Sequence, residues 1–222
     1  MTQAMADAMR PPFPAERGLD VYNKKLGMWI FLASEVMFFG ALIGSYVILR
    51  FGAAGDWAKP GVVLNIKITA FNTFLLICSS VSMVKAYAAI QDGYPDKLRF
   101  WLLMTILGGA CFVGIQVFEY IHLVEHGFVP SGVREGSELA EMVAAGSLPA
   151  ATMGLYGSTF FTMTGFHGFH VTCGVICMTF VTIKAFRGGY RGGRFHGVEV
   201  IGLYWHFVDL VWIILFTIVY LI

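Results

Sequence analysis

The chain alternates between long apolar stretches and short polar ones. Five stretches of about 20 residues or more carry few charges; they cover residues 27–49, 68–90, 100–123, 154–184 and 198–222. As an α-helix, a run of this length and composition matches the hydrocarbon thickness of a bilayer. The pattern predicts an all-α fold, a polytopic membrane bundle of five transmembrane helices. The fourth stretch is long enough to tilt or to extend beyond the bilayer.

The segments between these stretches are short and polar. Residues 1–26 hold prolines and charges but no apolar core, so we expect a tail that stays in the mature protein, followed by one transmembrane domain over 27–222. The longest connection, residues 124–153, is expected to hold a short helix around 138–145. Because no polar segment is long enough to form a domain, catalysis by a soluble module is excluded.

The overall composition agrees with a membrane protein. Hydrophobic residues make up 57% of the chain and charged residues only 13%, whereas about a quarter of a soluble domain is charged. The formal net charge of +1 gives no support for a nucleic-acid partner.

The distribution of basic residues predicts how the helices are oriented. The tail, the loop 91–99 and the loop 184–199 hold Arg10, Arg17, Lys24, Lys25, Lys97, Arg99, Lys184, Arg187, Arg191 and Arg194. The alternate loops hold only Arg50, Lys59, Lys67 and Arg134. Since basic loops stay on the cytoplasmic side, we expect a cytoplasmic N-terminus and, after five crossings, a C-terminus on the outer side.

Several ionisable residues lie within the apolar stretches, where they are costly and usually face protein or water. They are Glu35, Glu119, His122, His167, His170, His206 and Asp209. Three pairs among them are spaced i, i+3, so that each pair lies on one helix face.

This spacing raises the possibility of a metal site. Di-iron carboxylate proteins use Glu-x-x-His motifs on two helices of a bundle, and Glu119 with His122 forms one such motif. At about 1.5 Å per residue, however, Glu119 lies roughly 30 Å from the cytoplasmic end, while Glu35 and Asp209 lie roughly 12 to 17 Å from it. These residues cannot share one metal, so we expect none; an independent membrane di-iron enzyme is the remote alternative.

A haem is disfavoured on similar grounds. His167 and His170 project from one side of a single helix and cannot take opposite axial positions on one haem. The remaining interpretation is that His167, His170, His206, Asp209 and Glu119 form hydrogen bonds between helices, which offsets the cost of burying them. We expect His206 and Asp209 to lie at the depth of Glu35, close enough to form a network with it and with His170.

Two long motifs resemble a known family. Residues 154–171, GLYGSTFFTMTGFHGFHV, and residues 204–221, YWHFVDLVWIILFTIVYL, are similar to the two strongest signatures of subunit III of the haem-copper respiratory oxidases. The stretches LGMWIFLASEVMFFGALIGSYVI and GIQVFEY resemble two further helices of that family. The resemblance runs from about Lys25 to Ile222 and is to the five-helix bacterial form.

The resemblance implies a non-catalytic subunit of a proton-pumping terminal oxidase in the bacterial cytoplasmic membrane. Such a subunit carries no redox centre, binds phospholipid and packs against subunit I. Haem and copper reside in the partner subunits I and II, and cytochrome c is contacted only indirectly.

Two residues match positions with known roles in this family. Glu35 matches a buried glutamate that reacts with carbodiimides and has been linked to proton uptake. Arg187 resembles an arginine that contacts a lipid phosphate, which suits a basic residue on the cytoplasmic side. A role in setting the membrane topology alone would account for Arg187 equally well.

The chain also departs from the family pattern. The two N-terminal helices of the seven-helix members are missing, so lipid sites that depend on them do not carry over. The outer loop is extended over residues 131–150, and its purpose does not follow from the sequence. Glu35 in the sequence SEV and the sequence YGSTFF are more similar to the cytochrome c oxidases than to the quinol oxidases. A homologue associated with nitric oxide reductases is a third alternative.

Overall fold

The computed structural model describes residues 19–53, 55–190 and 195–222, and five long helices account for most of them. They are α2 (Leu19–Gly52), α4 (Ile66–Gln91), α5 (Pro95–Glu125), α7 (Ala150–Phe186) and α8 (His196–Phe216), which a π-helical turn, η1 (Thr217–Leu221), continues. All five are long and apolar enough to cross a membrane. The predicted helical membrane bundle is therefore confirmed.

Helix α2 begins earlier than expected. Its first residue is Leu19, inside the segment expected to be a tail, while residues 1–18 lie outside the described part of the chain. An apolar stretch marks only the part of a helix that lies in hydrocarbon, and polar residues can continue the helix beyond it.

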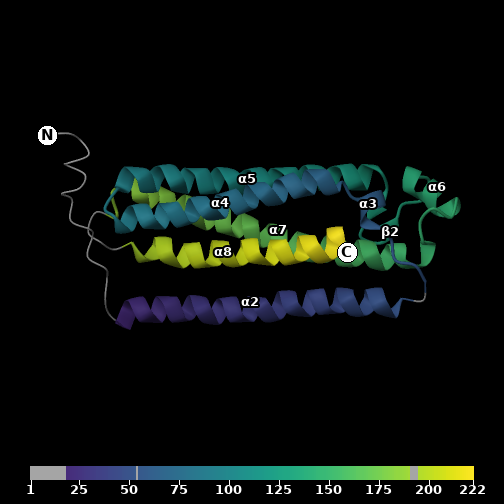
Figure 1. Cartoon of the computed structure of the whole chain (residues 1–222), viewed down its shortest axis with the longest axis horizontal. Helices are drawn as coiled ribbons and strands as arrows, with labels where there is room; N and C mark the ends of the chain where they lie inside the picture. The colour runs from purple at the N-terminus through teal and green to yellow at the C-terminus, as the bar shows by residue number, and fades with distance from the viewer. Residues whose placement is uncertain (1–18, 54, 191–194) are drawn as a thin grey trace.

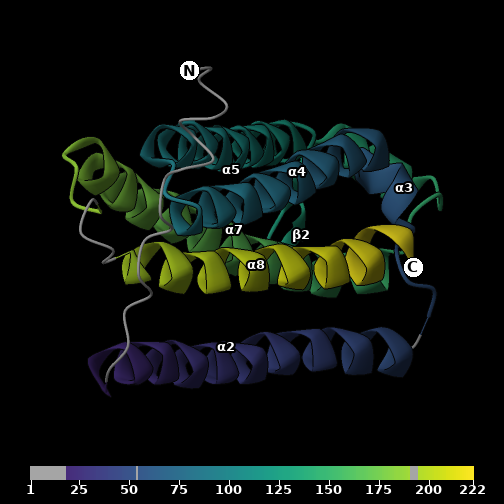
Figure 2. The same cartoon turned by 60° about the vertical axis from the view of Figure 1, so that its left-hand side comes forward.

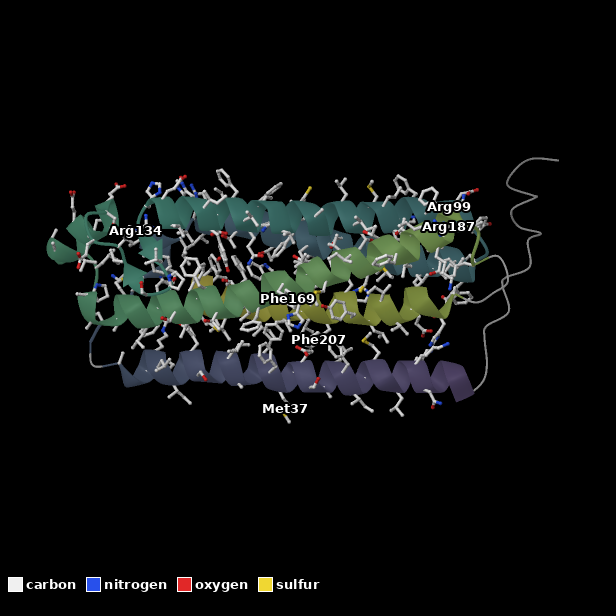
Figure 3. All side chains as sticks on the ribbon, turned by 180° about the vertical axis from the view of Figure 1, so that it is seen from behind. Met37, Arg99, Arg134, Phe169, Arg187 and Phe207 are labelled. Carbon is white, nitrogen blue, oxygen red and sulfur yellow. The ribbon has the colours of Figure 1, made fainter. Side chains whose placement is uncertain are left out.

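The short elements gather at one end of the bundle (Figure 1). They are α3 (Pro60–Val63), the antiparallel strands β1 (Phe128–Val129) and β2 (Gly132–Val133), and α6 (Glu138–Ala144). Helix α6 confirms the short helix expected in the long connection. Arg99 and Arg187 mark the opposite end (Figure 3).

Local chemistry explains several helix boundaries. The side chain of Asn65 accepts a hydrogen bond from the backbone N–H of Ile68 at the start of α4, and Ser137 caps α6 in the same way. Helix α5 begins with Pro95, which has no N–H to leave unpaired. Only Asp92–Tyr94 separate α4 from α5, and Gly93 supplies the positive φ of 79° that this tight turn needs.

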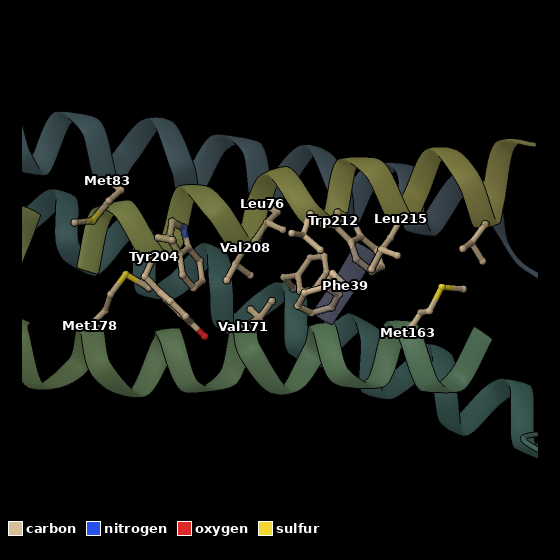
Figure 4. Close-up of a cluster of buried hydrophobic side chains, with 14 of the residues drawn as sticks. Phe39, Leu76, Met83, Met163, Val171, Met178, Tyr204, Val208, Trp212 and Leu215 are labelled. Atoms are coloured by element: carbon tan, nitrogen blue, oxygen red, sulfur yellow. The ribbon is translucent and has the colours of Figure 1, made fainter. Parts of the chain in front are cut away.

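Four of the long helices form a close-packed group, and α2 lies along its edge beside α8 (Figures 1 and 2). Part of the core lies between α7 and α8, where Met178, Val171 and Met163 of α7 lie toward Tyr204, Val208 and Leu215 of α8, in that order (Figure 4).

The largest buried side chain of α8, Trp205, fits between two glycines of neighbouring helices. A Cβ atom on Gly109 of α5 would lie 2.5 Å from Cη2 of Trp205, and one on Gly174 of α7 would lie 2.9 Å from its Cε3. The Trp205 indole N–H also donates to Ser79 Oγ of α4 at 3.1 Å. One side chain thus joins all four helices of the group.

Candidate functional site

Glu35 and His170 form a pair between α2 and α7. Oε2 of Glu35 lies 3.1 Å from Nε2 of His170, and the two side chains are only 16% and 13% exposed. The other ring nitrogen, Nδ1, lies 2.7 Å from the carbonyl oxygen of Phe166 and donates to it. The neutral imidazole therefore offers Nε2 as an acceptor. Because Nε2 and an ionised carboxylate are both acceptors, a hydrogen bond between them requires one proton between the two groups.

Apolar rings surround this pair. The ring of Phe39 lies 5.2 Å from the His170 ring, and that of Phe38 lies 6.4 Å from it, both measured between centroids. On the third side, the hydroxyl group of Tyr204 in α8 donates to the carbonyl oxygen of His170 at 2.8 Å. The pair is therefore held among three helices in a place of low polarity, where a proton-sharing pair is costly to separate.

His206 and Asp209 make their contacts elsewhere. Nδ1 of His206 lies 2.6 Å from Oγ of Ser80 on α4. The carboxyl group of Asp209 is buried near the same hydroxyl group, and its Oδ1 has no hydrogen-bond partner within the described residues. The expected network with Glu35 is not what the structure shows, because α8 turns these two side chains toward α4, away from α2.

His167 differs from the expectation as well. It is fully buried, its ring is stacked on Trp212 with centroids 4.8 Å apart, and Phe112 packs edge-on at 5.8 Å. Neither ring nitrogen has a hydrogen-bond partner in the described part of the chain. Residues three apart on a helix point about 60° apart, so His170 meets α2 while His167 enters the aromatic core.

Glu119 lies near the end of the bundle that carries α3 and α6. The hydroxyl group of Thr69 in α4 donates to Oε1 of Glu119 in α5 at 2.9 Å. One turn earlier on α5, the side-chain amide of Gln116 donates to the backbone carbonyl of Thr164 in α7 at 2.8 Å. These bonds join helices within the four-helix group and make no contact with the Glu35–His170 pair.

The partners of these residues come largely from α4, which sequence reasoning had missed. Its buried polar residues are Thr69, Asn72, Thr73, Ser79 and Ser80. Separations of three, four and seven residues recur among them, which places them on one helix face. That periodicity was the available signal, carried by small polar side chains and not by ionisable groups.

The described residues do not form a metal centre. Among them, no three His, Cys, Asp or Glu side chains converge closely enough to hold a metal ion. Glu119 and His122 lie on α5 without a second Glu-x-x-His motif near them.

Basic and aromatic side chains gather at the end of the bundle opposite α6. Arg187 is exposed directly after α7, and Arg99 Nε donates to the carbonyl oxygen of Ala185 at 3.2 Å (Figure 3). The ammonium of Lys184 lies over the ring of Tyr190, and burial raises the pKa of this tyrosine to about 12. Two further arginines expected on this side, Arg191 and Arg194, lie outside the described residues.

Comparison with known proteins identifies a family. The family model for cytochrome c oxidase subunit III matches residues 16–129 and 139–222. The probable cytochrome c oxidase subunit 3 of Mycobacterium tuberculosis is 35% identical over 197 residues, covering 89% of this chain and 87% of that protein. The cytochrome c oxidase subunit 3 of Bacillus subtilis is 32% identical over 215 residues, covering 95% and 92%. The chain therefore belongs to the cytochrome c oxidase subunit III family.

Proposed function

We propose that this chain is a non-catalytic subunit of a proton-pumping cytochrome c oxidase that supports proton uptake through the Glu35–His170 pair. Membership of the family makes the chain part of a multi-subunit oxidase. In the proposal it packs on subunit I of a bacterial cytoplasmic membrane, and subunits I and II hold the haem and copper. Its N-terminus is cytoplasmic and its C-terminus lies outside.

The observation that carries the proposal is the geometry of the pair. A carboxyl group and an imidazole 3.1 Å apart can exchange one proton. The apolar rings around them oppose the separation of charge, so in the proposal the two groups act together. Its position between α2 and the four-helix group supports a path along the edge of this subunit, toward the partner that reduces oxygen.

A second part of the proposal concerns lipid. Arg187 is exposed at the basic end of the bundle, where its guanidinium suits a phosphate oxygen of a phospholipid. The apolar side chains exposed along all five long helices are available to lipid and to a large membrane partner.

The first experiment is to purify the complex in mild detergent through a tag on this chain. We expect haem and a large multi-helix chain to co-purify, cytochrome c to be oxidised, and the chain to be colourless and metal-free once it is stripped of its partners. Iron that stays with the stripped chain would contradict the proposal and revive the di-iron alternative, with Glu119 and His122 as the first residues to replace.

The second experiment tests Glu35 directly. In the assembled complex, Glu35→Ala should leave oxygen reduction largely intact, because the carboxyl group holds no metal in the proposal, and should slow proton uptake. The number of protons taken up per oxygen and the reaction with a carbodiimide are measured together. Complete loss of oxygen reduction in a fully assembled complex would contradict the non-catalytic role.

A further inference from the structure

A pocket of about 650 Å³ lies at the end of the bundle that carries α3 and α6, away from the Glu35–His170 pair. Three segments enclose it: the junction of α3 with α4, the last turns of α5, and α6. The family model leaves residues 130–138 unmatched, and Glu138, the first residue of α6, lines the pocket. Part of this pocket therefore comes from the loop extension noted in the sequence.

Three basic side chains line the pocket, those of Lys67, His122 and His126. Nδ1 of His126 donates to the carbonyl oxygen of His122 at 2.8 Å, and the two imidazole rings lie 4.1 Å apart between centroids. No acidic side chain pairs with the ammonium of Lys67 within the described residues. The N-terminal turn of α4 also lines the pocket, and the N-terminus of a helix carries partial positive charge.

Two carboxyl groups line the same pocket. Glu138 Oε2 lies 4.0 Å from Nε2 of His126, and the Glu138 side chain is 74% exposed. Deeper in the pocket is the buried carboxyl group of Glu119, which holds one hydrogen bond from Thr69. The last turn of α5 adds the partial negative charge of a helix C-terminus. The pocket thus offers positive and negative groups a few ångströms apart.

The rim of the pocket is apolar and exposed. Val62, Ile68 and Phe118 line it and keep 49%, 38% and 63% of their surface accessible. Ile68 and Phe118 lie on helices that cross the membrane. An amphiphile in the pocket would therefore have its polar part among charges and its apolar part on membrane-exposed side chains.

We propose that this pocket binds the head group of an ethanolamine phospholipid. The phosphate lies against Lys67 and His122, the ammonium lies against the carboxyl groups of Glu138 and Glu119, and the acyl chains leave over Phe118 and Ile68. A phosphate alone would use the basic groups and leave the carboxyl group of Glu119 without a cation. A choline head group has no N–H to donate to them. The mixed charges therefore select a head group with both a phosphate and a primary ammonium.

This site is separate from the lipid contact proposed at Arg187, which lies at the other end of the bundle (Figure 3). It also does not depend on the proton-uptake role, so either proposal can fail alone.

The test uses the assembled complex, purified through a tag on this chain and reconstituted into nanodiscs of phosphatidylglycerol with a small share of photoactivatable phosphatidylethanolamine. Mass spectrometry locates the crosslinks. We expect labelling around Phe118–His126, and a decrease of about tenfold in Lys67→Met, since losing one charged contact costs about 1.4 kcal/mol or more. Lys59→Met removes an equal charge just outside the pocket lining and should leave the labelling unchanged.

A second variant tests the ammonium contact. Glu138→Gln should reduce labelling by the ethanolamine lipid several-fold, while Glu135→Gln, outside the pocket lining, should not. Photoactivatable phosphatidylcholine should label the pocket weakly in every variant. Equal labelling by the two lipids, or an equal decrease in Lys59→Met and Lys67→Met, would overturn the proposal. So would full competition by inorganic phosphate, which would indicate a simple anion site, or crosslinks from the pocket to a partner subunit in place of lipid.

Discussion

Helices α2 and α8 run side by side but are held in opposite ways. In the most apolar 18-residue stretch of α2, only 11% of the stretch is buried inside the protein, whereas 50% of the corresponding stretch of α8 is buried. Helix α8 is part of the group with α4, α5 and α7, whereas α2 lies along one edge of that group (Figure 2). In lipid, apolar contact between helices is hardly favoured over contact with acyl chains. A helix with so little close packing therefore depends more on its polar contacts.

Polar contacts of α2 are spread along its length. Near its start, Nζ of Lys25 lies 2.5 Å from Oε1 of Glu199 in α8. The Glu35–His170 pair lies near the middle, and at the far end Arg50 donates to the carbonyl oxygen of Ile222. The two helices are therefore held differently. Helix α8 is held by close packing of side chains inside the four-helix group, whereas α2 is held to that group by a few polar pairs.

The largest effect is expected where the fit is closest. In Gly109→Ala the new methyl group would meet Trp205 at 2.5 Å and Val175 at 2.8 Å, so the helices must separate, at a cost of about 1 to 3 kcal/mol. The thermal midpoint at which the tagged complex loses this subunit should fall clearly. Gly114→Ala, five residues along α5 with open space around it, is the matched control, and equal midpoints for the two variants would contradict the close fit.

A smaller, local effect is expected at the pair that holds α2. In His170→Leu the carboxyl group of Glu35 stays largely buried without its partner, which costs about 1 to 3 kcal/mol. Hydrogen exchange measured by mass spectrometry should show α2 losing protection by about tenfold or more, while α5 stays protected.

The double variant Glu35→Leu/His170→Leu sharpens this prediction. Removing both polar partners leaves no unpaired carboxyl group, so α2 should recover much of its protection. Additive losses in the double variant would show that the two residues do not depend on each other.

The smallest effect is expected at the Lys25–Glu199 bridge. Both side chains are partly exposed, at 38% and 23%, so Lys25→Met should cost below about 1 kcal/mol. The difference from the parent should shrink further in high salt, because salt screens exposed charges. Exchange rates in the first turns of α2 at low and high salt measure this. Lys59→Met controls for loss of charge alone, and an effect that is independent of salt would contradict an ion pair.

The sequence was sufficient to predict the helices and their number. Apolar length alone marks membrane helices because the bilayer imposes it. The short helix expected around 138–145 is α6, and in the structure the side chain of Ser137 caps it.

The sequence could not show which neighbour each polar face meets. That choice depends on the rotation of each helix, and a rotation of about 60° separates a histidine that pairs with Glu35 from one enclosed by Trp212 and Phe112. The partnership of His206 with Ser80 depends in the same way on how α4 and α8 are turned. The fit of Trp205 between two glycines involves three helices far apart in sequence, and no local pattern encodes it.

The three-residue turn between α4 and α5 has a consequence for biogenesis. Two helices joined by Asp92–Tyr94 cannot move far apart once both have left the translocon, and their mutual contacts close the shortest loop in the bundle. We therefore expect the hydroxyl and amide groups of α4 to find α5 before α8 is complete. The α4–α5 hairpin would then be the surface on which the later helices assemble, and α2, which packs on α7 and α8, would gain its neighbours last.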